Sequence, residues 1–526
     1  MSGTFWAFVP AIVAIILALA TKKVYLSLFV GIFVGAMFFV SGNPAYAMGV
    51  TYEVMSAKVG GNVPILVFLV VLGIFVVLMQ KSGGAKSYGE WAQQRIKSKR
   101  GALLSTAGLG CLIFVDDYFN CLTVGSVMRP VTDKFKVSHS KLAWIIDSTA
   151  APVCIIAPIS SWAAAVSGEL DGNKLIAFMS TIPFNIYAIL TLIMVFVFCI
   201  YKIDFGKMKK NEYQADFMDD LNAGETDLPT DEDKSIVANP KGKVRHLIIP
   251  VVTLIVFCIL GMIYTGYFYD WDAEVLGTTV QSESIIDAFS NCEAGLSLAI
   301  GSTFALFVIA VYYMIAKVVN FNDIMESIVQ GFKAMVPAIL ILVFAWTLSG
   351  IMGAKGGYLD AKAFVANNIA GVSIQWLFPA IFFLLACGIS FATGTSWGTF
   401  GVLISIVTTL LGGSSTLAVL TVSATLGGAV YGDHVSPISD TTILASAGGN
   451  CNHVDHVKTQ LPYASLIAVI AFVSYLVGGA VINAEINAVL GGLIMWAVAI
   501  ALFVCSVFVI KVIEKKKQNV ATESKE

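Results

Sequence analysis

Long apolar runs recur along almost the whole of this chain and constrain its fold more than any other feature. A helix of roughly 18 or more apolar residues is long enough to cross the ~30 Å hydrocarbon core of a bilayer. The runs that we interpret as spans are residues 6–20, 24–41, 63–80, 142–166, 174–201, 246–266, 294–316, 334–350, 416–434, 462–482 and 488–511. Only 13% of the residues are charged, whereas a soluble domain carries about 25%. The sequence therefore predicts an all-α polytopic membrane protein with about 11 transmembrane helices in a lipid bilayer, and it excludes a soluble enzyme or a nucleic-acid-binding protein.

Two further apolar segments, residues 102–129 and 373–411, are interrupted in the middle by polar, glycine-containing stretches. Loops rich in lysine and arginine, which face the cytoplasm, lie at residues 22–23, 81–100, 129–141, 202–210 with 241–245, and 515–517. All of them can be cytoplasmic only if segment 102–129 enters and leaves the membrane on the same side. We therefore expect two re-entrant hairpins, an N-terminus outside the cell and a cytoplasmic C-terminus, in a bacterial inner (cell) membrane.

Residues 202–245 form the one long polar segment, with 10 acidic and 8 basic residues. This composition is typical of a flexible, solvated linker. It separates residues 1–201 from residues 246–482, and residues 483–526 add a last transmembrane helix with a basic cytoplasmic tail.

The two sides of this linker resemble each other. Four short matches occur in the same order at offsets of 269 to 279: residues 26–31 with 296–301, 63–64 with 336–337, 84–86 with 353–355, and 158–161 with 437–440. Each second copy lies five spans after the first, and five is odd, so the second copy must face the opposite way across the membrane. Inverted-topology repeats are a signature of secondary transporters, whose sites lie near the midplane where interrupted helices meet.

Polar residues interrupt four apolar segments, two in each half. Those of the first half are Asp116, Asp117, Asn120 and Thr123 in the hairpin, and Ser160 and Ser161 in the broken helix 142–166. Those of the second half are Thr393, Thr395 and Ser396 in the hairpin, and Asp433, His434, Ser436, Ser439, Asp440 and Thr441 in the broken helix 416–442. An ionisable side chain at membrane depth costs at least ~2.5–3.5 kcal/mol on insertion scales, so a functional interpretation is the default. Carboxylates, hydroxyls and carbonyls are the hard oxygen ligands that a small cation prefers, and helix N-termini at the same breaks suit a carboxylate substrate.

Structural roles compete with ion binding at several of these positions. Asp116 and Asp117 could cap the returning helix of the first hairpin, and Asp440 could be the N-cap of the helix that follows it. His434 could simply be hydrogen-bonded to Asp433.

Other ionisable residues are expected to lie outside the site. Asp147 lies close to Lys141 and is expected to be a pairing residue at the level of the membrane interface. His453, Asp455 and His456 fall in a predicted cytoplasmic loop and are expected to be solvated.

Residues 394–398 (GTSWG) satisfy the G-x-S-x-G pattern of serine hydrolases, with Asp433, Asp440 and His434 as triad partners on paper. That motif requires a strand–turn–helix elbow, whereas this segment lies between two apolar helical arms. We expect the glycines to serve a tight hairpin turn, and the chain not to be an enzyme.

Residues 114–130 (FVDDYFNCLTVGSVMRP) and 432–442 (GDHVSPISDTT) resemble the NhaC family of Na+/H+ antiporters, within the ion-transporter superfamily. The resemblance implies a homodimer with a rigid scaffold and a transport subdomain that moves by an elevator mechanism. The family also includes a malate/lactate exchanger and members linked to amino acids, so the substrate is left open.

The sequence predicts a secondary antiporter that exchanges Na+ for H+, with Na+ as coupling ion and no other cofactor. Its alternative is a Na+-coupled transporter of an amino acid or small carboxylate with the same cation sites. One Na+ site would consist of Asp116, Asp117, Asn120, Ser160 and Ser161, and its counterpart of Thr395, Ser396, Ser436, Ser439 and Asp440. Asp433 or His434 would carry the proton, with Asp117 as a further candidate.

Overall fold

The computed structural model describes residues 3–21, 23–170, 174–225, 238–267, 288, 292–353, 358–361, 363–364, 374–412, 415–484 and 488–523. Within these ranges the chain forms α-helices and short 3-10 helices and no strand. This agrees with the predicted all-α class.

The first half contains η1 (Phe5–Phe8), α1 (Val9–Thr21), α2 (Val24–Phe39), α3 (Pro44–Gly60), α4 (Val63–Lys81), α5 (Gly84–Arg95), α6 (Lys99–Leu112), α7 (Asp117–Lys134), α8 (His139–Cys154), α9 (Ser161–Glu169), α10 (Lys174–Thr181), η2 (Ile182–Phe184), α11 (Ile186–Tyr201) and α12 (Gly206–Met218). The second half contains α13 (Arg245–Tyr267), α15 (Ala294–Ile315), α16 (Phe321–Met352), η4 (Gln375–Leu377), α18 (Phe378–Thr393), α19 (Ser396–Leu411), α20 (Thr416–Val435), α21 (Asp440–Gly449), α22 (His453–Asn483) and α23 (Ala488–Glu523).

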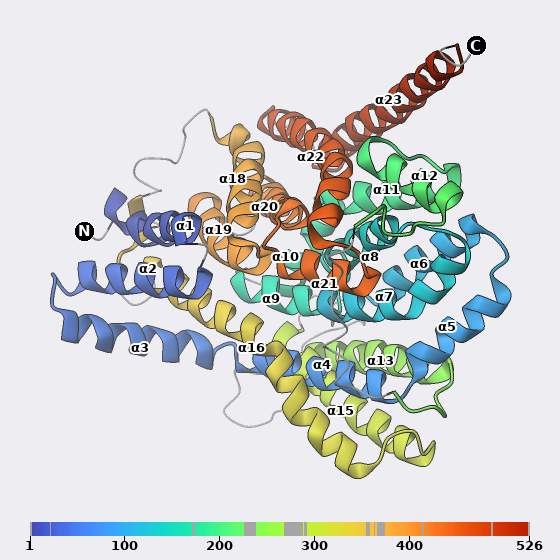
Figure 1. Cartoon of the computed structure of the whole chain (residues 1–526). Coiled ribbons are helices and arrows are strands. Elements are labelled where there is room, and N and C mark those ends of the chain that lie inside the picture. The colour runs from blue at the N-terminus through green and yellow to red at the C-terminus, as the bar shows by residue number, and fades with distance from the viewer. Residues whose placement is uncertain are drawn as a thin grey trace.

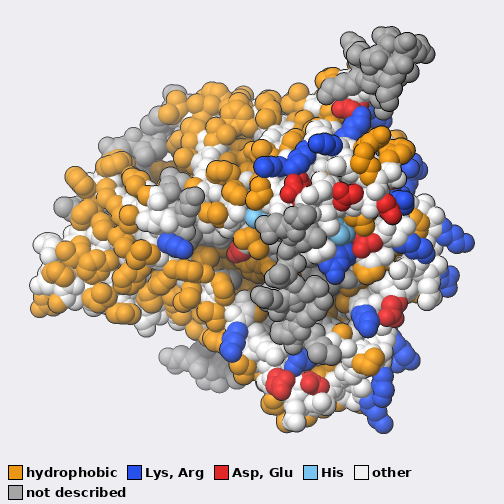
Figure 2. Space-filling view, in the orientation of Figure 1, with side chains coloured by type: hydrophobic (Ala, Val, Ile, Leu, Met, Phe, Trp, Pro, Cys, Tyr) orange, Lys and Arg blue, Asp and Glu red, His pale blue; other side chains and the backbone are white. Residues whose placement is uncertain are grey.

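The helices surround a central group of short, interrupted helices (Figure 1). Helix α8 lies in this centre, and every one of its residues is buried. Helices α2 and α3 extend to one side of the view, and α23 projects at the opposite, upper side. Apolar side chains cover much of the surface around α2 and α3, whereas most of the charged side chains gather on the opposite side, around α5 and α12 (Figure 2). We call this charged end the linker side because it carries α12.

In the part of the chain that the structure describes, seven helices are long and apolar enough to cross a membrane, or up to nine if each of two bent pairs is one span. The protein is therefore a multi-pass membrane protein. The number is lower than that of the predicted spans because several runs are divided into pieces too short to cross alone. Run 142–166, for example, divides into α8 and α9, which have 16 and 9 residues. Run 174–201 divides at η2 into α10 and α11, and the part from Ile186 onward still counts among the seven.

Three helices lie where the sequence analysis placed loops. Helix α3 occupies the predicted outer loop between residues 41 and 62, and α5 occupies the basic loop 81–100. The prediction of a flexible linker is wrong for α12, which buries Met208, Asn211 and Glu212. Glu212 and Asp216 of α12 pair with Lys99 of α6, and Lys207 pairs with Asp455 of α22. Residues 226–237 of the predicted linker lie outside the described residues.

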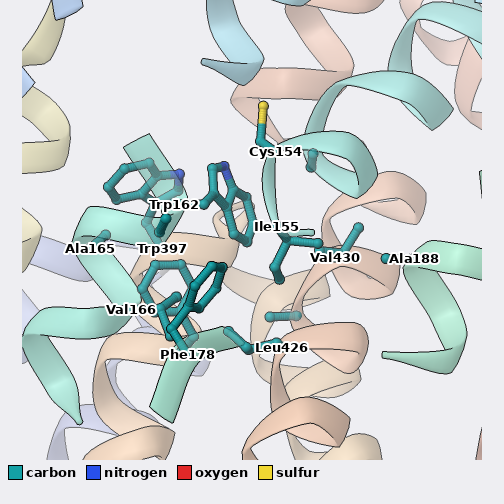
Figure 3. Close-up of a cluster of buried hydrophobic side chains, with 14 of the residues drawn as sticks. Cys154, Ile155, Trp162, Ala165, Val166, Phe178, Ala188, Trp397, Leu426 and Val430 are labelled. Carbon is teal, nitrogen blue, oxygen red and sulfur yellow. The ribbon is translucent and has the colours of Figure 1, made fainter. Parts of the chain in front are cut away.

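The core next to the interruptions is aromatic. Trp162 in the first turn of α9 and Trp397 in the first turn of α19 have ring centroids 5.9 Å apart, and Figure 3 shows them beside Val166 and Phe178. Both rings are almost completely buried. This packing joins an interrupted helix of the first half to one of the second.

Candidate functional site

All four predicted interruptions are places where one helix ends and another begins. Helix α6 ends at Leu112 before α7, α8 ends at Cys154 before α9, α18 ends at Thr393 before α19, and α20 ends at Val435 before α21. Pro158 and Pro437 follow the ends of α8 and α20, where a proline cannot donate the backbone hydrogen bond of a continuing helix. Gly394 ends α18 with a φ of 68°, a left-handed conformation that glycine adopts without steric cost.

Polar residues cap three of the four helices that begin at these interruptions. Asp116 Oδ1 accepts from the backbone N–H of Phe119 at 3.0 Å, Ser160 Oγ from that of Ala163 at 3.0 Å, and Ser439 Oγ from that of Thr442 at 3.1 Å. The capping role proposed for Asp116 is therefore real, whereas the N-cap of α21 is Ser439, and Asp440 is its first helical residue. Thr395 precedes α19 without a side-chain cap.

The N-terminal ends of these four helices contact one another. The backbone N–H of Ser161 in α9 donates to the carbonyl of Val115, just before α7, at 2.9 Å. The phenol of Tyr118 in α7 donates to Asp440 Oδ2 in α21 at 2.5 Å. With the Trp162–Trp397 contact between α9 and α19, these contacts gather four positive helix ends around one buried region.

Two glycines allow α7 and α21 to approach each other at backbone distance. A Cβ placed on Gly125 would lie 2.4 Å from the carbonyl carbon of Gly448. The thiol of Cys121, one turn earlier in α7, lies 3.7 Å from the carbonyl of Thr441. The first hairpin segment of the chain therefore packs directly on the last broken helix.

The residues predicted for the first cation site form a buried group of oxygens that lack partners. Asp116, Asp117, Asn120 and Ser161 are all at most 1% exposed. One oxygen of each (Oδ2, Oδ2, Oδ1 and Oγ, in that order) has no hydrogen-bond partner among the described residues. The amide of Asn120 donates to the carbonyls of Gly110 and Ile113, at 2.7 and 2.9 Å, which leaves its oxygen as the end available to a ligand.

Ser160 differs from its neighbour Ser161. Its hydroxyl donates to the carbonyl of Cys154 at 2.7 Å and accepts from the backbone N–H of Ala163 as the cap of α9. Both hydrogen bonds lie within the interruption between α8 and α9. Thr123 lies a turn beyond Asn120 in α7 and is 3% exposed.

Asp433 lies at the centre of a second cluster. Its Oδ2 accepts from the hydroxyls of Ser396 and Thr441, both at 2.9 Å, and its Oδ1 is buried without a partner among the described residues. The structure thus gathers Ser396 and Thr441 around Asp433. Asp440, which the sequence analysis placed in the second site, contacts Tyr118 of the other half instead.

The other predicted residues of the second half lie at the edges of this cluster. Ser436 donates to the carbonyl of Phe391 at 2.7 Å, and Ser439 lies 3.1 Å from the hydroxyl of Thr441. Thr393 bonds back to Ile389 within α18, and Thr395 is 7% exposed at the start of α19.

His434 is not hydrogen-bonded to Asp433. Its Nδ1 lies 3.0 Å from the phenol of Tyr187 in α11, and its Nε2 is buried without a partner in the described part of the chain. Successive residues of α20 point in different directions, which separates the two side chains.

Two expectations about ionisable residues outside the site are wrong. Asp147 is 0% exposed and contacts Gln460 and His456 of α22, while Lys141 pairs with Asp204. His456 and Asp455 are 0% and 2% exposed rather than solvated, because α22 begins at His453 and packs this end against α8 and α12. His453 is partly buried and contacts Pro437 and Ser446.

The G-x-S-x-G segment lies between α18 and α19, two helices, and not between a strand and a helix. The hydroxyl of Ser396 is within bonding distance of Asp433 Oδ2 and of the carbonyl of Ala429, at 2.9 and 3.1 Å. His434 turns to Tyr187 instead. This geometry does not provide the nucleophile–base contact of a serine hydrolase.

No group of three or more histidine, cysteine, aspartate or glutamate side chains is arranged to hold a metal ion within the described residues. A weakly held cation such as Na+ does not require such a group, because hydroxyl and carbonyl oxygens also bind hard cations. Membrane helices that are interrupted around buried carboxylates are typical of a secondary transporter.

Comparison with known proteins gives the family. Residues 166–480 match the Na+/H+ antiporter family, and because this is more than half of the chain, the protein belongs to that family. The resemblance found in the sequence is thereby confirmed. The match contains α18 to α21 and begins after the first cluster at Asp116.

Three relatives show how far the similarity extends. An uncharacterized protein of Haemophilus influenzae is 38% identical over 497 residues, which cover 91% of each chain. The malate-2H+/Na+-lactate antiporter of Bacillus subtilis is 34% identical over 153 residues, 28% of this chain and 31% of that one. The Na+/H+ antiporter NhaC of Alkalihalophilus pseudofirmus is 30% identical over 153 residues, 27% of this chain and 30% of that one.

Proposed function

We propose that this chain is a secondary antiporter that exchanges Na+ for H+ across the inner membrane of a bacterium. The observation that carries the proposal is the set of buried oxygens without partners at Asp116, Asp117, Asn120 and Ser161. An unsatisfied buried acceptor costs about 1–3 kcal/mol, more when it is charged, and a bound cation would remove that cost. Family membership supports the same activity.

In this proposal the first cluster binds Na+ through those four oxygens, with Ser160 holding the break open as the cap of α9. The second site is centred on Asp433, with Ser396 and Thr441 as neighbours, and Thr395, Ser436 and Ser439 line its edge. A carboxylate in either cluster can bind H+ or a cation. Binding of one weakens binding of the other, because each neutralises the charge that attracts the other. Competition for the carboxylates is the simplest basis for exchange.

We propose that the two halves are inverted repeats and that transport occurs by an elevator motion. The support for this proposal is the order of elements, in which each half contains an interrupted pair (α6–α7, α18–α19) followed by a broken helix (α8–α9, α20–α21). We also propose the homodimer, the external N-terminus and the cytoplasmic C-terminus. Crosslinking in membranes and reporters fused to each terminus would test them.

Exchange is tested with purified protein in liposomes that contain a pH-sensitive dye, by adding Na+ outside. We expect internal alkalinisation without any organic solute, and its loss in Asp117→Asn. Asp219→Asn is the matched control, because this exposed aspartate lies on the linker side in an ion pair with Lys136. A silent wild-type protein would contradict Na+/H+ exchange.

A second candidate function is Na+-coupled transport of a small carboxylate or amino acid. Helix α19 favours it, since it begins at the site without a side-chain cap, and free N–H groups at a helix N-terminus bind carboxylates. Lys141, although 1% exposed, already pairs with Asp204 and so is not available to such a ligand. In the same liposomes this function predicts a response that requires malate, lactate or an amino acid.

A further inference from the structure

Asp147 of α8 and His456 of α22 form a buried acid–imidazole pair that the proposed cation sites do not include. Asp147 Oδ2 and His456 Nε2 are 3.3 Å apart, and both side chains are 0% exposed. The same oxygen accepts from Gln460 Nε2 at 2.6 Å and from Thr442 Oγ1 at 3.2 Å. Asp147 Oδ1 and His456 Nδ1 are buried without partners among the described residues.

Two of these partners also reach the end of α20 beside the second cluster. Gln460 Nε2 donates to the carbonyl of His434 at 2.8 Å, and its two hydrogens allow it to serve Asp147 at the same time. Thr442 Oγ1 lies 3.1 Å from the carbonyl of Asp433 but has a single hydrogen. It can donate to Asp147 or to the Asp433 carbonyl, but not to both.

The charge on Asp147 decides that choice. An ionised Asp147 attracts the Thr442 hydrogen, because hydrogen bonds to a charged acceptor are about twice as strong as neutral ones. A protonated Asp147 releases it to the Asp433 carbonyl. The pair is therefore connected to the cation cluster by a hydrogen bond with two alternative acceptors.

Other titratable and charged groups surround the pair on every side. They are Cys121 from α7, Tyr187 from α11, Asp433 and His434 from α20, Asp440 from α21, and Asp455 of α22 with its ion-pair partner Lys207 of α12. Lys141, on α8 itself, is neutralised by Asp204. Lys207 belongs to α12, the helix that marks the linker side of the protein.

We propose that Asp147 and His456 form a second proton-binding site, and that a proton bound there opposes cation binding at Asp433. The proton raises the charge of the pair by one unit beside the cluster. When it is held on Asp147 it also frees Thr442 to donate to the Asp433 carbonyl, which accepts from the backbone N–H of Ser436 at 3.1 Å as well. Since coupling between two sites is reciprocal, Na+ at Asp433 expels the proton from the pair. This inference rests on the proposed Na+/H+ exchange and adds to it a proton separate from those on the cation-binding carboxylates.

The test measures the Na+ concentration for half-maximal exchange as a function of pH in the liposome assay. Each proton that competes with Na+ raises this concentration by about tenfold per pH unit below its pKa. In the wild-type protein the Na+ concentration for half-maximal exchange should therefore rise by more than about tenfold per pH unit over part of the pH range. In Asp147→Asn and His456→Gln this rise should approach about tenfold per pH unit, because the carboxylates of the cation sites still titrate.

Two matched controls separate the pair from its surroundings. Asp455→Asn changes an equally buried aspartate next to His456 and should keep the wild-type pH dependence. Thr442→Ser retains the hydroxyl and should also retain the wild-type pH dependence. Thr442→Val removes the hydroxyl and should make the pH dependence less steep. Exchange of radioactive Na+ for unlabelled Na+ shows in each variant that the cation sites are intact.

The outcomes are distinct. A silent wild-type protein is a failure of the proposed function, not of this inference alone. Active variants with the wild-type pH dependence overturn the inference. If Asp147→Asn also loses Na+/Na+ exchange, His456→Gln decides: a flattened dependence supports the site, and an unchanged one, or loss of Na+/Na+ exchange there too, overturns it.

Discussion

Tyr118 joins the two halves of this antiporter by donating a 2.5 Å hydrogen bond from its phenol to Oδ2 of Asp440. Tyr118 lies in the first turn of α7 and Asp440 begins α21. The bond therefore links the first hairpin segment to the last broken helix at the level of the proposed cation sites.

Removing this hydroxyl should loosen that link. Tyr118→Phe keeps the ring but leaves Asp440 Oδ2 without its donor, and hydrogen bonds to charged groups contribute about 1.5–3 kcal/mol. We expect lower thermal stability in detergent and slower Na+/H+ exchange. Unchanged stability together with unchanged exchange would show that the bond has no role.

Two adjacent serines should separate stability from ion binding. Ser160→Ala removes the cap of α9 and should cost about 0.5–2 kcal/mol of stability. Ser161→Ala removes an oxygen without a partner and should raise the Na+ concentration for half-maximal exchange while leaving the melting temperature unchanged. Equal effects of both substitutions on both readouts would contradict the assignment.

The interruptions were predictable because their causes are local. Proline, glycine and capping residues act within a few positions of a helix end, and so the ends of α8, α18 and α20 can be found in the sequence alone. The carboxylates of the first cluster were predictable as candidates for a related reason, since an ionisable side chain in an apolar segment is costly and indicates a functional site.

The pair of Asp147 and His456 was not predictable in this way. The two residues are 309 positions apart, and neither has a local signature beyond the spacing of His456 and Gln460, which places both on one face of α22. For the same reason the charge density of residues 202–245 does not predict helix α12. From the sequence alone a lysine or glutamate is expected to be solvated, because its partner in the tertiary structure is not known.

The contact between α7 and α21 should not tolerate a methyl group. Gly125→Ala would place Cβ 2.4 Å from the backbone of Gly448 and must push the two helices apart, so we expect loss of exchange and a lower melting temperature. Gly108→Ala is the matched control in the neighbouring helix α6, where a Cβ meets nothing within 4 Å. There the substitution should be neutral or stabilise by up to about 1 kcal/mol.

The ordered linker helix should contribute to stability through Glu212, which accepts from the backbone N–H of Ser138 at 2.8 Å and pairs with Lys99 at 2.8 Å. Burial lowers the pKa of Lys99, but the charges of Glu212 and Asp216 and their hydrogen bonds outweigh it and leave the pKa above its usual value. A raised pKa means that the stabilisation is fully present below the unfolded-state pKa and is lost only as the pH rises through the folded-state pKa.

Glu212→Gln should therefore lower the melting temperature in detergent by a similar amount at every pH near neutrality, and the difference from wild type should shrink only in strongly alkaline solution. Asp219→Asn removes the exposed ion pair with Lys136 on the same segment and should have little effect, as is usual for surface pairs. If Glu212→Gln melts like wild type near pH 7, the contacts of Glu212 with Ser138 and Lys99 contribute nothing to stability.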